Sequence, residues 1–297
     1  MRIREPGKIR EGLWMLGRAE SCVYVVEGTT ESMIISGGIS YLVPSLLEQF
    51  DTFGIDPTRI TKLLILHAHF DHVGIVPFFK RRYPHLNVYA SARGWEILEM
   101  VKARRIINEF SRAVSLRMGK EGVCDRYDVD WRDDVTGNAL SEGDRLELGN
   151  LDVLIHETPG HSSCSITAYV PQLKALFASD AGGIPYKETI LTYGNSNFTM
   201  YQQSLEKIKD LDAEYVCADH YGCVVGAEAK DFTRATAVKA REYRALLEKT
   251  YRRTGDIQTA ARELASAFQR EHPDNILTRE ISEEVIKQMI QHIAHGD

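Results

Sequence analysis

Apolar residues fall into short runs along most of the chain. Between some of these runs lie segments whose apolar residues are spaced as in a helix. Runs of four to six apolar residues are typical of strands, whereas apolar residues at intervals of three or four indicate helices. The pattern predicts strands over residues 13–16, 22–27, 33–36, 63–66, 87–90, 151–155, 166–170, 175–178 and 214–218, with β structure also at Arg145. It predicts helices over residues 43–50, 75–83 and 94–118. We therefore expect two sheets between layers of helices.

Strand patterns end near residue 226, and Ala-, Glu-, Arg- and Lys-rich segments follow. Helical spacing predicts helices over residues 227–253, 257–271 and 279–294, with Asp256 and Thr278 as helix caps and a break at His272-Pro273-Asp274. We expect one large domain over residues 1–226 and a helical cap over residues 227–297. The cap could cover a cleft, form a dimer contact or complete the core, and we favour a cover that selects the substrate.

The predicted helix over residues 94–118 carries many apolar side chains, which can pack on the body or line an entrance. They are Trp95, Ile97, Leu98, Val101, Ile106, Ile107 and Phe110. We favour the packing role, since large apolar side chains at helical spacing most often belong to a core.

Three histidines and an aspartate lie within six residues, in the run His67-Ala68-His69-Phe70-Asp71-His72. The run directly follows the apolar stretch 63–66, which needs cover on both faces and therefore predicts a buried strand. Alternation along an extended chain places His67 and His69 on one side, while Asp71 and His72 can turn toward a second point. The run thus predicts a metal site with room for two ions.

A single histidine is more often a structural or surface residue than a metal ligand. We assign that role to the histidines without partners at ligand spacing, which are His85, His156, His272, His292 and His295. The same explanation is poor for the run 67–72, because burying three imidazoles and a carboxylate together costs desolvation and like-charge repulsion.

The run His67-x-His69-x-Asp71-His72 resembles the signature of the metallo-β-lactamase-fold hydrolases. Three later positions match the same family pattern, each after an apolar run: His161 in Pro-Gly-His-Ser, Asp180 after Ser179, and His220 in Asp-His-Tyr-Gly. The resemblance implies an α+β fold, an αββα four-layer sandwich, with a catalytic domain over residues 1–226 and a C-terminal helical appendage.

The resemblance also implies how the site residues are used. His67, His69 and His161 would hold one metal, Asp71, His72 and His220 the other, and Asp180 would bridge the two. It gives Asp71 and Asp180 a catalytic role in addition.

Two divalent cations that share a water lower its pKa from 15.7 toward ~7, which supplies hydroxide as a nucleophile at neutral pH. We therefore expect a metal-dependent hydrolase that uses a metal-bridging hydroxide and acts on a small-molecule substrate. Histidine and aspartate suit zinc, iron or manganese alike, so the ligand set leaves the metal open. Redox chemistry is disfavoured, because the related flavodiiron oxygen reductases usually carry Glu where this chain has His69, and no flavodoxin-like half is evident.

Three positions depart from the usual family pattern. Ser36 stands where many relatives have a supporting Asp in an Ile-Asp-Thr-Gly turn, Cys164 stands where Gly is common, and Ser179 precedes Asp180 in place of Gly. A hydroxyl forms hydrogen bonds but carries no charge. We therefore expect Ser36 to change the orientation or basicity of a ligand without abolishing metal binding.

The helical appendage and the Gly-Gly-Ile-Ser turn at residues 37–40 resemble the quinolone-signal response thioesterase type of Pseudomonas, with glyoxalase II-type enzymes more distant. That resemblance implies a thioester hydrolase of the acyl-CoA type. A phosphodiesterase that uses the same site, and a regulatory protein with secondary hydrolase activity, are the alternatives. Tyr193, Asn195 and Tyr221 are candidates for the substrate pocket.

Composition agrees with a cytoplasmic enzyme. The 297 residues are 43% apolar, enough for a sizeable core, and a net charge of -6 makes nucleic acid an unlikely partner. Five cysteines without paired spacing indicate reduced thiols, and we expect the Cys217 side chain to be buried in the core.

No segment has the ~18 uninterrupted apolar residues of a membrane span, so we expect no membrane partner. A homodimer is compatible with the sequence.

Overall fold

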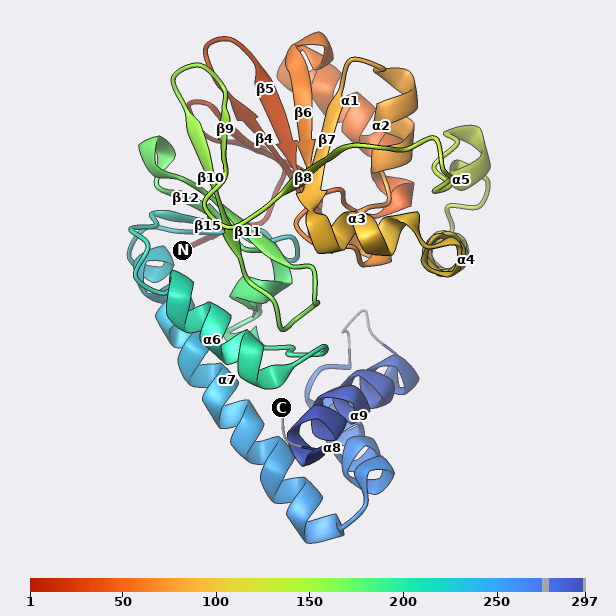
Figure 1. The fold of residues 1–297 in the computed structure, drawn as a ribbon, viewed down its shortest axis with the longest axis vertical. Helices are drawn as coiled ribbons and strands as arrows, with labels where there is room; N and C mark the ends of the chain where they lie inside the picture. The colour runs from red at the N-terminus through yellow and green to blue at the C-terminus, as the bar shows by residue number, and fades with distance from the viewer. Residues whose placement is uncertain (274–277, 296–297) are drawn as a thin grey trace.

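The computed structural model describes residues 1–273 and 278–295, and in this part of the chain two seven-stranded sheets pack face to face (Figure 1). The first sheet has the order β2-β3-β4-β5-β6-β7-β8. Its strands are β2 (Gly7–Arg10), β3 (Leu13–Arg18), β4 (Ser21–Glu27), β5 (Ser32–Ile35), β6 (Ile60–Leu64), β7 (Asn87–Ser91) and β8 (Asn138–Leu140). Strands β2 to β5 pair antiparallel, and β5 to β8 pair parallel.

The second sheet has the order β1-β16-β15-β12-β11-β10-β9. Its strands are β1 (Arg2–Ile3), β16 (Cys223–Val225), β15 (Tyr215–Cys217), β12 (Ala175–Phe177), β11 (Ile166–Val170), β10 (Asp152–Glu157) and β9 (Arg145–Glu147). A separate hairpin joins β13 (Ile184–Tyr186) to β14 (Thr189–Leu191). The helices are α1 (Val43–Phe53), α2 (Val76–Arg82), α3 (Ala92–Glu99), α4 (Val101–Arg117), α5 (Val123–Arg126), α6 (Phe198–Ile208), α7 (Ala227–Thr254), α8 (Ile257–Glu271) and α9 (Arg279–His295).

The apolar stretch 63–66 shows why the strands carry continuous apolar runs. Leu63 and Ile65 belong to the core between the first sheet and its helices, whereas Leu64 and Leu66 belong to the core between the two sheets. Side chains alternate across a strand, so a strand covered on both faces needs apolar residues at every position. The prediction of a buried strand before the histidine run is confirmed.

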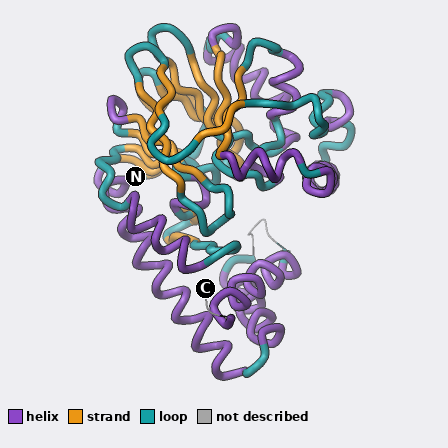
Figure 2. The backbone as a smooth tube through the Cα atoms, viewed as in Figure 1, coloured by secondary structure: helices purple, strands orange, loops and turns teal. Residues whose placement is uncertain are grey.

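Helices cover the outer face of each sheet. Helices α1, α2 and α3 pack on the first sheet through side chains such as Phe50, Phe79 and Trp95, and α6 and α7 pack on the second sheet through Ile208 and Phe232. Figure 2 shows the two strand layers between helices. The predicted αββα four-layer sandwich is therefore confirmed.

The C-terminal helices extend beyond the sandwich. Helix α7 begins on the second sheet and runs away from it, and α8 and α9 pack back against α7 (Figure 1). Asp256 caps α8 by accepting a hydrogen bond from the Thr259 amide, and the Thr278 hydroxyl accepts one from the Ile281 amide, as predicted. Asp274, placed in the predicted break, lies outside the described residues. Over the described residues, no helix is both long and apolar enough to cross a membrane.

The predicted helix over residues 94–118 is instead two helices. The chain is extended at Met100, where ψ is 123°, and this residue ends α3 and begins α4. The apolar spacing continues across the break, so it carries no signal of the change in direction. The pattern also left out the short strands β1, β2, β8, β13, β14 and β16 and the helices α5 and α6.

Candidate metal centre

The predicted site residues all lie in turns that follow strands. His67 and His69 lie in the loop after β6, and Asp71 and His72 lie in the tight turn that ends this loop. His161 follows β10, Asp180 follows β12, and His220 follows β15. Because β6 belongs to one sheet and the other three strands to its partner, the candidate ligands meet where the two sheets face each other.

Backbone conformation in these turns is unusual. Gly160, which precedes His161, has φ +129°, and a Cβ there would lie 2.1 Å from the Tyr201 amide nitrogen, so glycine is required. Ser36, Ser179 and Tyr221 have φ values of 73°, 47° and 63°, a region that side chains rarely adopt. Strained residues of this kind cluster at functional sites, and two of these three are direct neighbours of candidate ligands.

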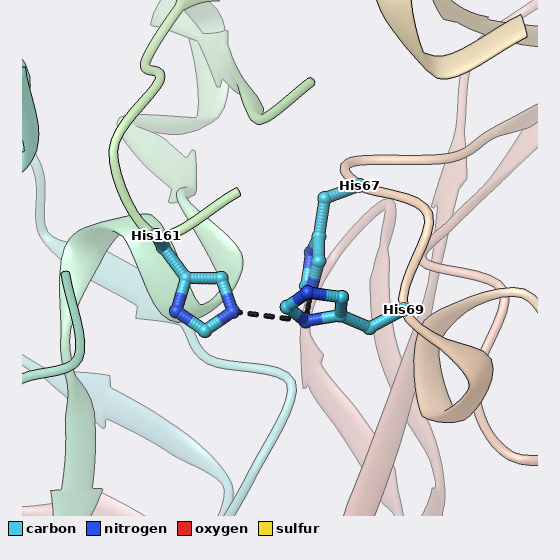
Figure 3. Close-up of side chains that lie close together, drawn as sticks. All are labelled: His67, His69 and His161. Atoms are coloured by element: carbon cyan, nitrogen blue, oxygen red, sulfur yellow. Dashed lines mark hydrogen bonds between the residues drawn. The ribbon is translucent and has the colours of Figure 1, made fainter. Parts of the chain in front are cut away.

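Three imidazoles form the first group (Figure 3). The His67 Nε2 atom lies 3.1 Å from His69 Nδ1, and His161 Nε2 lies 3.2 Å from the same His69 nitrogen. Figure 3 shows His67 and His69 projecting from one loop toward His161 on a separate segment. One nitrogen from each residue is close enough to the others for a single ion to contact all three.

Asp71, His72 and His220 form the second group, and Asp180 lies between the groups. The His220 Nε2 atom is 3.2 Å from His72 Nε2 and 3.8 Å from Asp71 Oδ2. One carboxylate oxygen of Asp180 lies 3.4 Å from both His72 Nε2 and His161 Nε2, and the other lies 3.5 Å from His220 Nε2. The structure thus brings all seven predicted residues together, in the two groups that the resemblance implies.

The outward-facing nitrogens of the histidines are held by protein groups. His161 Nδ1 donates to the Tyr193 carbonyl oxygen at 2.8 Å, and His220 Nδ1 donates to the Glu20 carbonyl oxygen at 2.7 Å. Since the proton sits on Nδ1, the Nε2 lone pair of each ring points into the cluster. Metal-binding histidines typically have this arrangement, in which an outer hydrogen bond fixes the tautomer and the ring.

Asp219 is a site residue that the sequence analysis did not identify. Its side chain is 2% exposed, and its Oδ2 atom accepts hydrogen bonds from His72 Nδ1 at 2.8 Å, from Ser36 Oγ at 2.9 Å and from Ser179 Oγ. Asp219 therefore fixes the orientation of the His72 ring through the nitrogen that faces away from the other candidate ligands. The repeated Asp-His pair, at 71–72 and again at 219–220, was the available signal.

Ser36, Ser179 and Cys164, the three departures from the family pattern, each contact the site region. Ser36 and Ser179 both donate to the Asp219 carboxylate, which agrees with the expectation that Ser36 acts on ligand orientation. The Cys164 sulfur accepts a hydrogen bond from the Ala68 amide between His67 and His69. All five cysteines are buried free thiols, Cys217 among them, as expected.

The cluster shifts the ionisation of its members in opposite directions. Burial lowers the pKa of His67 and His161 and lowers that of His69 to about 4, so these rings are neutral near pH 7. Burial also opposes a charge on His72, but the carboxylates of Asp71 and Asp180 raise the pKa of His72 well above its usual value. Burial alone would raise the pKa of Asp180, yet the nearby His220 and His72 hold it well below its usual range.

These observations fit a pair of divalent metal ions. The neutral rings of His67, His69 and His161 and the ionised Asp180 are the forms that bind zinc, iron or manganese. His72 is the exception, because Asp71 and Asp180 favour its protonated form, and a divalent cation would bind there by displacing that proton. Asp180 Oδ1 is buried without a hydrogen-bond partner among the described residues, as expected for a carboxylate oxygen that serves as a ligand. His85 and His292 are exposed and His156 is half-buried, and none of them joins the cluster, whereas the side chain of His295 lies outside the described residues.

A cavity of about 440 Å³ opens onto the cluster. Candidate ligands form its floor, and Tyr193, Asn195 and Tyr221 line it, as the sequence analysis suggested. Its walls are mainly apolar and come from three regions: Ile97, Ala103, Ile106, Ile107 and Phe110 of α3 and α4, Ile184 and Leu191 of the hairpin, and Ile281, Val285 and Gln288 of α9. The preference for a packing role of residues 94–118 was therefore incomplete, because several of these side chains line the cavity.

Comparisons with known proteins give the same fold. The chain is 26% identical over 169 residues to a hydroxyacylglutathione hydrolase of Bradyrhizobium sp. (strain ORS 278), which covers 54% of this chain and 49% of that protein. The chain therefore spans about half the length of this curated relative. A metallo-beta-lactamase family protein of Thermus thermophilus superposes with a TM-score of 0.68 at 18% identity, over 97% of this chain and 95% of the other.

The fold is shared with a redox enzyme as well. Rubredoxin oxygen:oxidoreductase of Desulfovibrio gigas superposes with a TM-score of 0.55 at 16% identity, over 84% of this chain and 70% of the other. Similarity at this level defines the fold and leaves the chemistry to the site. The family model of the metallo-beta-lactamase superfamily matches residues 17–220, a segment that includes all seven candidate ligands. This chain belongs to the metallo-beta-lactamase superfamily.

Proposed function

We propose that the protein is a dinuclear metal-dependent hydrolase that cleaves a thioester, or a related acyl bond, of a small molecule with a bulky apolar acyl group. The observation that carries this proposal is the apolar cavity of about 440 Å³ that opens directly onto the two ligand groups. Apolar walls favour an apolar substrate part, since burial stabilises binding by roughly 25 cal/mol per Å² of apolar surface.

Some residues of the site would bind the metals, and others would bind the substrate. Two divalent cations bound there would lower the pKa of a shared water and polarise the carbonyl oxygen of the substrate. Asp180 supplies negative charge between the two groups, and the outer hydrogen bonds of His161 and His220 keep their rings in place. Ile107 and Phe110 provide an apolar wall beside the site, which would orient the acyl group and exclude water.

The cavity disfavours a phosphodiester substrate. Among the described residues that line it, none is Lys or Arg. Recognition of a phosphodiester usually employs such cations, whereas the carbonyl of an acyl substrate needs only the metals and hydrogen-bond donors. The name of the Bradyrhizobium relative, a hydroxyacylglutathione hydrolase, and the resemblance to the quinolone-signal response thioesterase type both support an acyl thioester.

The test is thiol release from a panel of acyl-CoA and acyl-glutathione thioesters with aromatic, branched and short aliphatic acyl groups. The protein is loaded with zinc, or anaerobically with iron, and Asp180→Asn is the control for metal dependence. We expect the wild type to release thiol and to prefer bulky apolar acyl groups, while Asp180→Asn is nearly inactive. Hydrolysis of bis(4-nitrophenyl) phosphate without thiol release from any thioester would contradict the proposal.

A second variant tests whether the cavity selects the acyl group. Ala103 lies on the cavity wall in α4, and Ala103→Phe would fill part of the space. We expect this variant to lose activity toward aromatic acyl groups and to retain it toward acetyl thioesters, because the metal ligands are untouched. An equal loss for both acyl classes would show that the cavity does not determine the preference.

A further inference from the structure

A second cavity, of about 380 Å³, lies between the β13–β14 hairpin and the three C-terminal helices. Apolar side chains of α7, α8 and α9 line it, including Leu246, Leu264 and Ile286. It shares Leu191 and Tyr193 with the cavity of the metal centre, so these two residues form a wall between the cavities.

Helix α9 contributes to both cavities through different faces. Ile281 and Val285, four residues apart, line the cavity of the metal centre. Ser282 and Ile286, shifted by one position, line the second cavity. Because neighbouring residues on a helix point about 100° apart, α9 presents one face to each cavity.

Two polar groups at the second cavity have no hydrogen-bond partner within the described part of the chain. Ser282 is 5% exposed, and its hydroxyl oxygen is buried and unpaired. The Nδ1 atom of His272 is also buried and unpaired, while its ring packs against Phe268 with the centroids 4.9 Å apart. A buried polar group without a partner is unfavourable, so a ligand that supplied a hydrogen bond would relieve this cost.

The charged residues at this cavity do not favour a charged ligand. Lys239 is paired with Glu242 at 2.8 Å, and Glu271 adds a further carboxylate. A ligand with a carboxylate or phosphate would face this acidic side, and a cation would have to lose its hydration against mainly apolar walls. The lining therefore fits an uncharged molecule.

We propose that this second cavity is a binding site for a small, uncharged, mainly apolar molecule that carries one hydrogen-bonding group, at a position distinct from the metal centre. The volume suits a molecule of two or three fused or linked rings. Ser282 forms the hydrogen bond to the polar group of the ligand, and the apolar side chains of the three helices enclose its body. The site goes beyond the proposed hydrolysis, because it touches none of the candidate metal ligands.

The first experiment locates a fluorescent probe. N-phenyl-1-naphthylamine, a neutral three-ring amine, is titrated into the full-length, zinc-loaded protein, and the rise in its fluorescence gives a dissociation constant. Ala267 lines the second cavity from α8, and Ala103 lines the metal cavity from α4, which makes Ala267→Phe and Ala103→Phe a matched pair. We expect Ala267→Phe to weaken probe binding by at least about tenfold, and Ala103→Phe to leave it within about twofold.

Loss of probe binding in Ala103→Phe alone would place the probe at the metal centre and overturn the proposal. No probe binding by the wild type would overturn it as well. Thermal unfolding of both variants shows whether each is folded.

The second experiment tests the hydrogen bond and does not depend on the folding of Ala267→Phe. Displacement of the probe by 2-naphthol and by 2-methylnaphthalene compares a hydroxyl with a methyl group on the same ring system. We expect 2-naphthol to bind the wild type about threefold to tenfold more tightly, and Ser282→Ala to remove this difference. An unchanged difference in Ser282→Ala would contradict the role of Ser282. These binding measurements are independent of any hydrolysis, so they stand or fall separately from the proposed function.

Discussion

The two ligand groups of the candidate metal centre differ in the charge around them. His67, His69 and His161 contact one another, and the carboxylate that reaches this group is Asp180. His72 in the second group has Asp71 and Asp180 within 3.6 Å of its Nε2 atom and Asp219 at its Nδ1 atom. The first group therefore presents neutral nitrogen ligands, and the second balances the charge of a cation with several carboxylates.

This difference predicts how single substitutions should affect the binding of each metal. A residue that reaches both groups should affect both metals, a residue of one group should affect one metal, and a residue that only orients a ligand should weaken binding without removing it. The first case is Asp180, and the second is His69 or His220. The third case includes Asp219 and Ser36, for which the expected effects are smaller and smallest.

Removing the charge of Asp180 should have the largest effect. Asp180→Asn keeps the shape of the side chain but loses the negative charge that lies within 3.5 Å of His72, His161 and His220. We expect hydrolysis to fall by more than about 100-fold and bound metal to fall from about two ions per chain to less than one. Elemental analysis after dialysis, together with thiol-release assays, measures both. Full metal content and full activity in this variant would rule out a bridging role.

Removing one ligand from either group should abolish the binding of one metal and leave the other bound. His69→Ala belongs to the first group and His220→Ala to the second, so each variant should retain about one ion per chain while losing most activity. His156→Ala, at a half-buried histidine in β10, is the matched control and should keep both ions. Elemental analysis combined with competition by a chromophoric chelator distinguishes the sites. Loss of both ions in His69→Ala and in His220→Ala would show that the groups do not bind metal independently.

The positions of the candidate ligands were predictable from the sequence because they match the motif of the family, and each follows an apolar strand closely. His67 lies three residues after β6 ends, within a local run of histidines, whereas Asp180, three residues after β12 ends, was located by the resemblance to the family. The layers of the fold were predictable for the same reason, since stretches such as 63–66 require cover on two faces.

Features that depend on distant contacts were not predictable in this way. The repeated Asp-His pair draws attention to Asp219, but it does not indicate that this side chain meets His72, which is 147 positions away. Ile281 and Val285 show helical spacing, but spacing alone does not reveal that they face the metal centre while Ile286 faces another cavity. The break at Met100 was missed because the apolar spacing continues through it.

Changing the residue that orients His72 should weaken metal binding without removing a ligand. Asp219→Asn loses the charge that accepts the hydrogen bond from His72 Nδ1 at 2.8 Å. We expect the affinity of the second group for metal to fall by about 10- to 100-fold, the range typical of such supporting residues, with little change in the first group. Metal titration against a chelator measures this, with Asp212→Asn, an exposed carboxylate on the surface, as the control. An affinity within twofold of the wild type would show that Asp219 serves only the fold.

The smallest effect is expected at Ser36, where the chain lacks the aspartate common in relatives. Ser36→Ala removes one of the hydrogen bonds to Asp219 Oδ2, and the donors on His72 and Ser179 remain. The loss of one hydrogen bond corresponds to about 0.5–1.5 kcal/mol, so we expect metal affinity to fall by about threefold to tenfold, less than in Asp219→Asn. Ser40→Ala, at a buried serine that contacts Cys124, is the control and should leave metal affinity unchanged. A loss in Ser36→Ala as large as in Asp219→Asn would mean that Asp219 depends on Ser36 for its position, and the carboxylate and the hydroxyl would then act as one unit rather than in the graded order argued here.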